Sequence, residues 1–394
     1  DVVHAQDANV RADTTAVKTD SMEIYGYVMM DAGYNFNQID PNWFDVVRPT
    51  KLPSSKNEFG TDGNTYLSVR QTRFGVKNYF NTPLGQMKTQ FEFEMFGTGV
   101  DAGQTTIRLR HAYGELGKFG AGQYWSPFMD IDVFPNTVEY WGPNGMVFFR
   151  NVQLRYMPIK GEYNKLTFAL ERPGASADQG VYKNRIELQN VSPRFPLPDL
   201  SGEYRMGGKW GYLELAGILR RIEWKDQNAD SINLSGHATG WGLNLSTNIK
   251  LGKKALFKGQ AVYGKGIENY MNDAPVDIAI KNNFSNPTTP VIGVALPVLG
   301  IVAFLDLKWN KKFSSSIGYS RVDIDNTNAQ DSSAFKNGQY AIANFLYYPS
   351  ENTMAGIEYQ WGDRNNFKDG FHTSISKIQL SFRYNFSQKI YRNR

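Results

Sequence analysis

The most constraining feature of this sequence is a two-residue alternation that recurs along most of its length. It is clearest in residues 374–386, where Ile378, Leu380, Phe382 and Tyr384 alternate with charged and polar residues. Successive side chains of a β-strand point to opposite faces, so this segment is predicted to be a strand with one apolar and one polar face. A helix of the same sequence would distribute its charges all round, which favours the strand.

The alternation recurs often enough to predict sixteen strands, an even number. The predicted strands are residues 22–36, 66–79, 87–95, 107–113, 118–124, 151–157, 165–171, 200–206, 211–220, 237–251, 255–264, 300–309, 313–322, 339–348, 354–362 and 374–386. In residues 66–79 the alternation puts apolar and charged side chains on the same face, because Phe74 and Val76 share the parity of Arg70. A bulge or a protein-covered patch is expected there.

The connections between these strands alternate between short and long, as periplasmic turns and extracellular loops do in a transmembrane β-barrel. A soluble sandwich has no reason to alternate in this way. Aromatic residues make up 14% of the chain while its mean hydropathy is only −0.47. That combination suits a barrel, in which only every second strand residue meets lipid. No run of 18 apolar residues occurs, so a helical membrane protein is not predicted.

Composition excludes several classes of protein. The absence of cysteine rules out disulfides, thiolate metal sites and cysteine nucleophiles. The net charge is +5, from 43 basic and 38 acidic residues that are interspersed, so no nucleic-acid partner is predicted. The chain is expected to divide into a flexible periplasmic tail (1–20), a transmembrane barrel (21–386) and a periplasmic extension (387–394).

Several motifs resemble the DcaP-like outer-membrane porin family. They include Arg108–Gly114 (RLRHAYG), Gly122–Asp130 (GQYWSPFMD), Gly142–Gly145 (GPNG) and Ala343–Pro349 (ANFLYYP). Their order and spacing carry the resemblance from about residue 22 to residue 386. The resemblance implies a sixteen-stranded trimeric channel of the Gram-negative outer membrane, which passes small and often negatively charged solutes such as dicarboxylates. Members of this family often carry an N-terminal coiled coil, for which residues 1–20 are too short.

Strand parity predicts which charged side chains face the interior of the barrel. The predicted anion-contacting pore wall consists of Arg73, Lys88, Arg108, Arg110, Arg155 and Arg383, and the predicted opposing acidic wall of Glu92, Glu94 and Glu358. Rows of opposite sign would set up a transverse field, and surplus arginine would attract anions and hold them weakly. The alternative is that the arginines only neutralise nearby carboxylates, and both roles can coexist.

The long connection 127–150 is expected to be the third extracellular loop, which folds inward and narrows the channel in porins. The residues expected at this constriction are Asp130, Asp132, Glu139, Tyr140 and Trp141. Their negative charge would stand opposite the wall arginines, and their aromatic rings would line the path of flat solutes. The alternative is an outward loop whose aromatic rings pack on one another.

Two further features need an interpretation. The apolar stretch Val291–Leu305 is expected either to plug the barrel or to cover a subunit contact, with the latter favoured, and to continue into the twelfth strand. Of the four histidines, His111 and His237 share parity with lipid-facing residues, which is the wrong side for catalysis in the lumen. No phosphate-binding loop or zinc motif occurs, so neither an enzyme nor a cofactor is predicted.

These observations predict a homotrimeric porin in the outer membrane of a Gram-negative bacterium, with membrane lipid and small anionic solutes as its partners. Solutes would diffuse through a water-filled channel. The alternative is a plugged barrel that serves as an adhesion or assembly scaffold through its loops.

Overall fold

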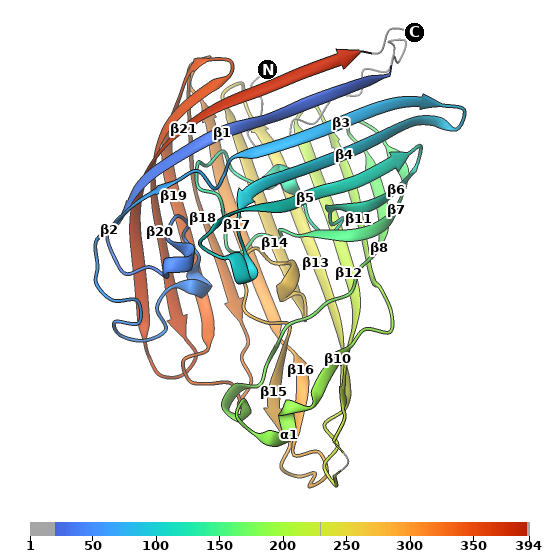
Figure 1. Cartoon of the computed structure of the whole chain (residues 1–394), viewed down its shortest axis with the longest axis vertical. Coiled ribbons are helices and arrows are strands. Elements are labelled where there is room, and N and C mark those ends of the chain that lie inside the picture. The colour runs from blue at the N-terminus through green and yellow to red at the C-terminus, as the bar shows by residue number, and fades with distance from the viewer. Residues whose placement is uncertain (1–19, 229, 392–394) are drawn as a thin grey trace.

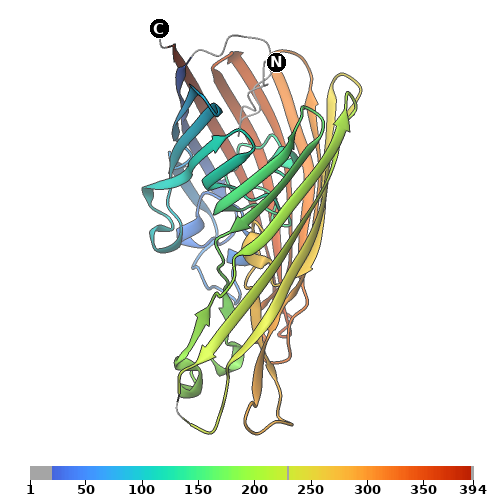
Figure 2. The same cartoon turned by 90° about the vertical axis from the view of Figure 1, so that its right-hand side faces the viewer.

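The chain forms a closed antiparallel β-barrel in the computed structural model, which describes residues 20–228 and 230–391 (Figure 1, Figure 2). Its sheet contains 18 strand segments, and it closes because β1 pairs with both β3 and β21. Segments β2 and β3 both pair with β1, and β10 and β11 both pair with β12. Each pair of segments is one interrupted strand, so the barrel has the 16 strands that the alternation predicts.

The structure bounds each element as follows. The barrel consists of β1 (Ser21–Asn35), β2 (Asn64–Ser68), β3 (Arg73–Thr82), β4 (Gly85–Phe96), β5 (Thr105–Leu116), β6 (Phe119–Trp125), β7 (Arg150–Lys160), β8 (Lys165–Glu171), β10 (Val191–Arg194), β11 (Asp199–Gly208), β12 (Gly211–Asp226), β13 (Gly236–Leu251), β14 (Ala255–Lys265), β17 (Pro297–Lys308), β18 (Phe313–Ile324), β19 (Phe335–Ser350), β20 (Thr353–Asn366) and β21 (His372–Tyr391). The loops contain β9 (Ala177–Asp178), β15 (Ile278–Asn282), β16 (Val291–Ala295), the helix α1 (Ile186–Gln189) and six 3-10 turns, at Pro41–Trp43, Pro49–Lys51, Gly99–Asp101, Ile131–Val133, Gly180–Tyr182 and Glu268–Tyr270. Among the described residues, no helix is both long and apolar enough to cross a membrane.

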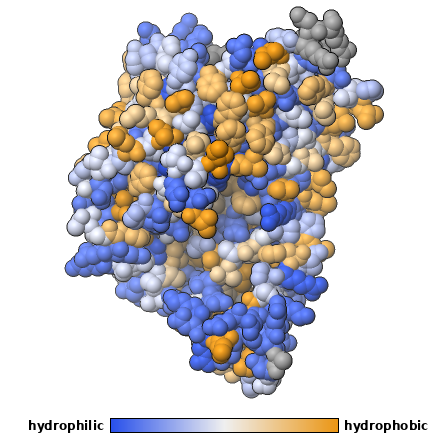
Figure 3. Space-filling view, viewed as in Figure 1, coloured by the Kyte–Doolittle hydropathy of each residue, from blue (hydrophilic) through white to orange (hydrophobic). Residues whose placement is uncertain are grey.

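The strands show the predicted alternation in their burial. In β21, Leu380 and Phe382 are exposed on the outer face, whereas Lys377 and Arg383 are buried on the inner face. Figure 3 shows apolar side chains gathered over the strands and hydrophilic ones over the loops at the lower end. This inverted surface is the one that lipid requires, with apolar residues outside and polar residues inside.

The two ends of the barrel differ. Tight turns and both ends of the described chain lie at the upper end in Figure 1, and the long loops extend from the lower end. We call these the turn end and the loop end. The long loops include residues 36–63, 126–149, 172–190 and 266–296, as the alternation of connection lengths predicts.

The mixture of apolar and charged side chains on one predicted face of residues 66–79 has a structural cause. The strand is interrupted between Ser68 and Arg73, where Thr72 donates to the carbonyl of Val69 in a turn. Inward residues have even numbers before this turn, as in Ser68, and odd numbers after it, as in Arg73 and Lys77. The turn therefore resets the parity, and Phe74 faces outward as its apolar side chain requires.

The interior of the barrel is not wholly water-filled, which corrects the simplest form of the prediction. Loop residues such as Phe128, Phe134 and Met146 pack against inward residues of the wall such as Val302 and Ile342, and together they form a buried apolar cluster. The third loop is thus folded into the barrel. Because apolar side chains on this loop and on the facing wall leave water together, the loop is held in place by the hydrophobic effect.

The apolar stretch Val291–Leu305 contributes to two different sheets of the fold. Its first part is β16, which pairs with β15, and β15 pairs with β9 in a small sheet at the loop end. From Pro297 onward it is β17, the twelfth barrel strand. The expected cover of a subunit contact stays a prediction for β16, which packs against β15 and other loop segments of its own chain. The continuation into the twelfth strand is confirmed.

The predicted end of the barrel at residue 386 is too early. Strand β21 continues to Tyr391, and residues 387–391 pair with residues 21–25 of β1. Backbone pairing continues here after the alternation of side chains has ended. The predicted tail lies outside the described residues, apart from Asp20.

Candidate functional site

A cluster of arginines and glutamates lies on the inner face of β3, β4 and β5. The guanidinium of Arg110 donates through Nε to Glu92 at 2.5 Å and through Nη1 to Glu94 at 2.7 Å. Arg73 lies on the other side of β4, with Nη2 3.4 Å from Glu94 and Nε 3.8 Å from Glu92. The register explains the contact with Arg73, since Arg73 is directly opposite Glu94 on the neighbouring strand.

Two further arginines approach the same carboxylates. Arg108 and Arg150 each place a guanidinium nitrogen 3.8 Å from Oε1 of Glu94. Four guanidiniums therefore surround the two carboxylates of this cluster, which leaves it with a surplus of two positive charges. Arg108 is the most accessible of the four, with its side chain 31% exposed.

The remaining predicted basic residues also lie on inward faces. Arg155 donates to the side chain of Gln153 and to the carbonyl of Trp125, and Arg383 lies over the ring of Tyr27. Tyr27 also contacts Arg73, so Arg383 belongs to the neighbourhood of the cluster. Lys88 is half-buried on β4, nearer to the turn end.

The predicted opposing acidic wall is not observed. Glu92 and Glu94 lie on β4, between the strands of Arg73 and Arg110, and they bind these arginines directly. In this part of the wall the arginines therefore neutralise neighbouring carboxylates, which is the alternative that the sequence left open. Glu358 is on β20 and accepts hydrogen bonds from Thr137 and from the backbone amides of Val138 and Glu139. Its role is to hold the third loop.

The predicted lipid-facing position of His111 is wrong. The β4–β5 ladder shifts register here, because His111 pairs with Glu92 while Leu109 pairs with the next residue, Phe93. The extra residue Arg110 forms a bulge that turns His111 inward. The imidazole is fully buried against Tyr124 and Trp125, with Nε2 3.9 Å from Glu92.

Asp130 and Asp132 of the third loop do not face the arginine cluster as predicted. The side chain of Asp130 accepts from the amide of Asp132 at 3.0 Å and so caps the 3-10 turn Ile131–Val133. Both carboxylates bind Arg205 of β11, Asp130 at 2.7 Å and Asp132 at 2.6 Å. Ser246 of β13 donates to Asp130 at 2.6 Å, so this part of the loop is fixed to the wall formed by β11–β13.

Glu139 of the third loop is fully buried and joins three parts of the structure. Its carboxylate accepts from the amide of Val47 in the first loop at 3.1 Å, from the amide of Gly142 and from the hydroxyl of Tyr340 on β19 at 3.1 Å. Burial, and to a lesser extent the neighbouring Glu358, raise the pKa of Glu139 to about 7.

Tyr140 and Trp141 are the part of the loop nearest to the arginine cluster. Tyr140 stacks on Phe96 and donates its hydroxyl hydrogen to Glu94. Trp141 covers one side of the guanidinium of Arg48, 3.8 Å from the ring centroid, while Trp43 contacts it at 4.1 Å. Arg48 also binds Asp273 of the 266–296 loop at 2.9 Å, so it connects three loops.

A cavity of about 270 Å³ lies beside this contact. Its polar side chains are Arg108, Arg150, Gln123 and Asn272, and its apolar lining includes Tyr140, Trp141, Phe148, Phe149, Leu109 and Met271. Two guanidiniums at an aromatic-lined cavity offer charge and flat surfaces to a small anion. No group of three or more His, Asp or Glu side chains within the described ranges could hold a metal ion.

Sequence reasoning missed three residues of this site. Arg205 shares its parity with Glu203, so the alternation could have found it. Arg150 has the parity of outward residues and reaches Glu94 only because it stands at the start of β7, where the loop joins the wall. Arg48 lies in a loop, where there is no strand alternation to indicate which way a side chain points.

Comparisons with known proteins agree with this geometry. Residues 2–386 match the profile of the DcaP outer membrane protein family. The outer membrane channel DcaP of Acinetobacter baumannii superposes with a TM-score of 0.77 at 22% identity, over 94% of this chain and 99% of that one. An anion-selective porin from Comamonas acidovorans superposes with a TM-score of 0.61 at 11% identity, over 93% of this chain and all of that one. No curated protein sequence matches.

A closed 16-stranded barrel with an inward third loop, an apolar outer belt and a charged interior is an outer-membrane porin, which is a channel fold rather than an enzyme fold. Its place is the outer membrane of a Gram-negative bacterium. This chain belongs to the DcaP outer membrane protein family.

Proposed function

We propose that this porin passes small hydrophilic anions, dicarboxylates among them, by facilitated diffusion. The observation that carries the proposal is the positive surplus of the cluster of Arg73, Arg108, Arg110 and Arg150 around two glutamates. Arg155 and Arg383 add further positive charge on the inner wall. A surplus of this sign raises the local concentration of anions and lowers that of cations.

The arginines suit carboxylates in particular, because a planar guanidinium binds a carboxylate through two parallel hydrogen bonds. Several guanidiniums in succession would let a solute exchange one partner for another without being trapped, as conduction requires. Transport then follows the gradient and needs no cofactor. The Comamonas acidovorans barrel, which has the same fold, is described as anion-selective, and this description supports the same preference here.

The third loop would set the size limit, with Asp130, Asp132, Glu139, Tyr140 and Trp141 as its predicted residues. In the proposed mechanism Tyr140 and Trp141 face the solute. The three carboxylates hold the loop to the wall, because each is engaged by Arg205 or by hydrogen-bond donors.

We further propose that the barrel is a homotrimer. Strand β5 pairs with β6 only from Ala112 to Leu116, so its half toward the loop end has no ladder on that side. The side chain of Gln123 donates to the carbonyls of Leu109 and Arg110 at 3.2 and 3.0 Å. A strand edge facing lipid is costly because its polar groups find no water, and a neighbouring copy would cover it.

One observation favours a second candidate function, a plugged scaffold that binds partners through its loops. The buried cluster of Phe128, Phe134 and Met146 occupies part of the barrel interior, and a small sheet of β9, β15 and β16 extends beyond the wall. If loops block the remaining space, no solute would pass.

Conductance in planar bilayers tests both candidates. The purified protein should open in steps of three equal levels and show an anion-selective reversal potential in a salt gradient. Silence at all voltages would favour the scaffold. Swelling of liposomes in mono- and dicarboxylates, sugars and phosphate would then identify the solute class.

A further inference from the structure

Four cationic side chains gather on the outer face of the barrel near the loop end. Arg221 and Lys225 lie on either side of Glu223 on the outward face of β12, since the intervening Ile222 is buried inside. Arg194 of β10 is directly opposite Glu223. Lys265 of β14 is exposed and lies two strands away.

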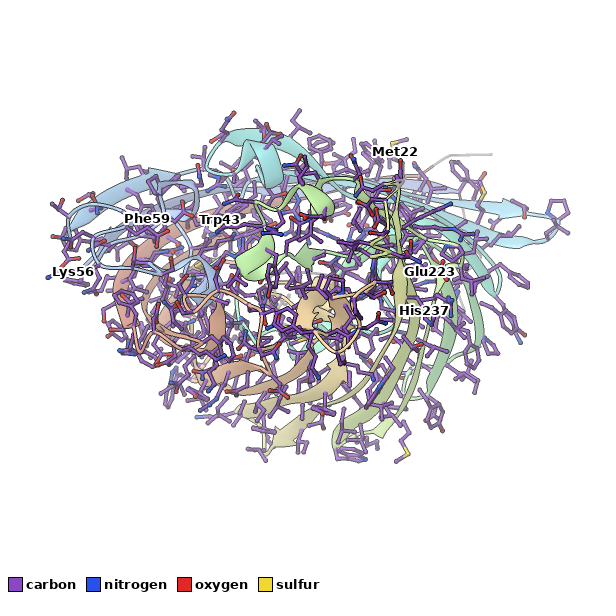
Figure 4. The ribbon with its side chains drawn as sticks, turned by 90° about the horizontal axis from the view of Figure 1, so that it is seen from below. Met22, Trp43, Lys56, Phe59, Glu223 and His237 are labelled. Carbon is purple, nitrogen blue, oxygen red and sulfur yellow. The ribbon has the colours of Figure 1, made fainter. Side chains whose placement is uncertain are left out.

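The position of this group is fixed by the ladder. Glu223 also pairs with His237 of β13, and the two residues lie close together in the view from the loop end (Figure 4). Arg221 pairs with Thr239, and Trp241, two residues further along β13, pairs with Lys265. With strands about 4.8 Å apart and about 3.4 Å per residue, Arg221 and Lys265 are roughly 12 Å apart.

The charges of this group do not cancel. Glu223 is the carboxylate that the structure pairs with these cations, with one oxygen 2.5 Å from Arg221 and the other 3.6 Å from Arg194. Against four cations it leaves a surplus of three positive charges. Arg321 on the outer face of β18 is a contrast, because Asp323 neutralises it through bonds of 2.6 and 2.7 Å.

A lipid-facing surface begins next to the cations, on the side toward the turn end. Trp241 and Tyr263 form an edge-to-face pair with centroids 6.0 Å apart, as in the aromatic girdle that marks a membrane interface. Leu219 of β12, Leu243 of β13 and Leu299 of the neighbouring β17 are exposed beside these rings. The four cations therefore stand at the level of lipid headgroups in the leaflet at the loop end, which is the outer leaflet of the outer membrane.

We propose that this face binds lipopolysaccharide, the phosphate-bearing glycolipid of the outer leaflet. Its phosphates bind Arg194, Arg221, Lys225 and Lys265, and its acyl chains lie on the leucines and aromatic rings on the side toward the turn end. Arginine and lysine bind phosphate through short charge-assisted hydrogen bonds. The spread of the cations over three strands suits a headgroup with more than one phosphate. This site depends on the place of the barrel in the membrane and is independent of the solute that the channel carries.

The test is native mass spectrometry of the full-length protein in detergent, titrated with diphosphorylated lipid A. A variant with Arg194→Gln, Arg221→Gln, Lys225→Gln and Lys265→Gln should bind it at least about tenfold more weakly, since each cation near an anionic lipid surface adds to affinity. The matched control replaces Lys209, Lys250, Lys253 and Lys254 with glutamine. These four exposed lysines belong to the turn end of the same strands, and their loss should change affinity by less than about twofold.

Two further measurements keep the proposal falsifiable if the fourfold variant does not fold. The single change Glu223→Gln removes the counter-charge and should tighten binding. Lipid A without phosphates should bind the native protein as weakly as diphosphorylated lipid A binds the fourfold variant. Native affinity in the folded fourfold variant, equal losses in both fourfold proteins, or no dependence on phosphate would each overturn the proposal.

Discussion

Arg110 and Glu94 form a buried ion pair on the inner wall, with Nη1 of the arginine 2.7 Å from Oε2 of the glutamate. Arg108, two residues earlier on β5, is 3.8 Å from the other oxygen of Glu94, and its side chain is 31% exposed. The two arginines therefore differ in kind. Arg110 balances buried carboxylates, whereas Arg108 presents charge to the lumen.

The first prediction separates these two roles. Arg108→Ala should shift the reversal potential toward cation selectivity and leave thermal stability nearly unchanged, because the lost pair is long and partly solvated. Arg110→Ala should lower the free energy of unfolding by about 3 kcal/mol, because it leaves Glu92 and Glu94 buried with less compensation. Bilayer reversal potentials and thermal melting in detergent provide the two measurements. An unchanged reversal potential in Arg108→Ala would remove this residue from the mechanism.

The second prediction concerns pH and Glu139. Its pKa in the folded barrel is about 7, above the ordinary value of 4.5, because the carboxyl is buried and lies near Glu358. A raised pKa means that the folded state binds the proton more tightly. The resulting stabilisation is complete below pH 4.5 and is lost as the pH rises through 7, with a limit of about 3 kcal/mol.

The third loop should therefore be held more loosely at pH 8 than at pH 5. Hydrogen exchange of the amides in residues 126–149 measures this directly. Glu139→Gln should flatten the pH dependence, because an amide has no proton to lose. The exposed Glu351→Gln in a turn is the matched control and should keep the native profile. A native-like pH dependence in Glu139→Gln would assign the effect to another group.

The third prediction concerns Arg48, which lies over the rings of both Trp43 and Trp141 and is bound to Asp273. Arg48→Ala should destabilise the packing of three loops by about 3 kcal/mol, because it removes both ring contacts and leaves Asp273 without this cation. Arg48→Lys keeps the charge but not the flat guanidinium, so it should recover only part of the loss. Tryptophan fluorescence during thermal unfolding reports on both rings. Full recovery in Arg48→Lys would show that charge alone matters.

The alternation of residues 374–386 predicted much of the fold, because every strand of a barrel repeats one constraint, with lipid outside and polar groups inside. The same rule fails where the backbone departs from its period. The bulge at Arg110 turns His111 inward, and the turn after Ser68 resets the parity before Arg73. The prediction counts residues as odd or even, so one extra residue in a strand exchanges the inward and outward positions in the rest of that strand.

The partners of the loop residues could not be predicted for a different reason. Arg48 and Asp273 are 225 positions apart, and Asp132 meets Arg205 only because the third loop enters the barrel on the side of β11–β13. Such contacts depend on the direction of a loop in space, which has no local signature. Sequence reasoning therefore placed the wall arginines and glutamates inside the barrel, but it missed Arg48, Arg150 and Arg205 and expected the glutamates on the opposite side of the pore.

The last prediction tests how closely the third loop must approach the wall. Gly145 lies so near to β18 that an added Cβ atom would be 2.1 Å from the carbonyl oxygen of Arg321, and its amide donates to Ser320 at 2.9 Å. Gly145→Ala should force the loop away from the wall, lower the stability by about 2 kcal/mol and make the single-channel current noisier. Gly174→Ala is the matched control, since a Cβ atom there would meet no atom within 4 Å. Equal melting temperatures and equal current noise in the two variants would mean that the loop is not held by this contact, and that the buried apolar cluster alone keeps it inside the barrel.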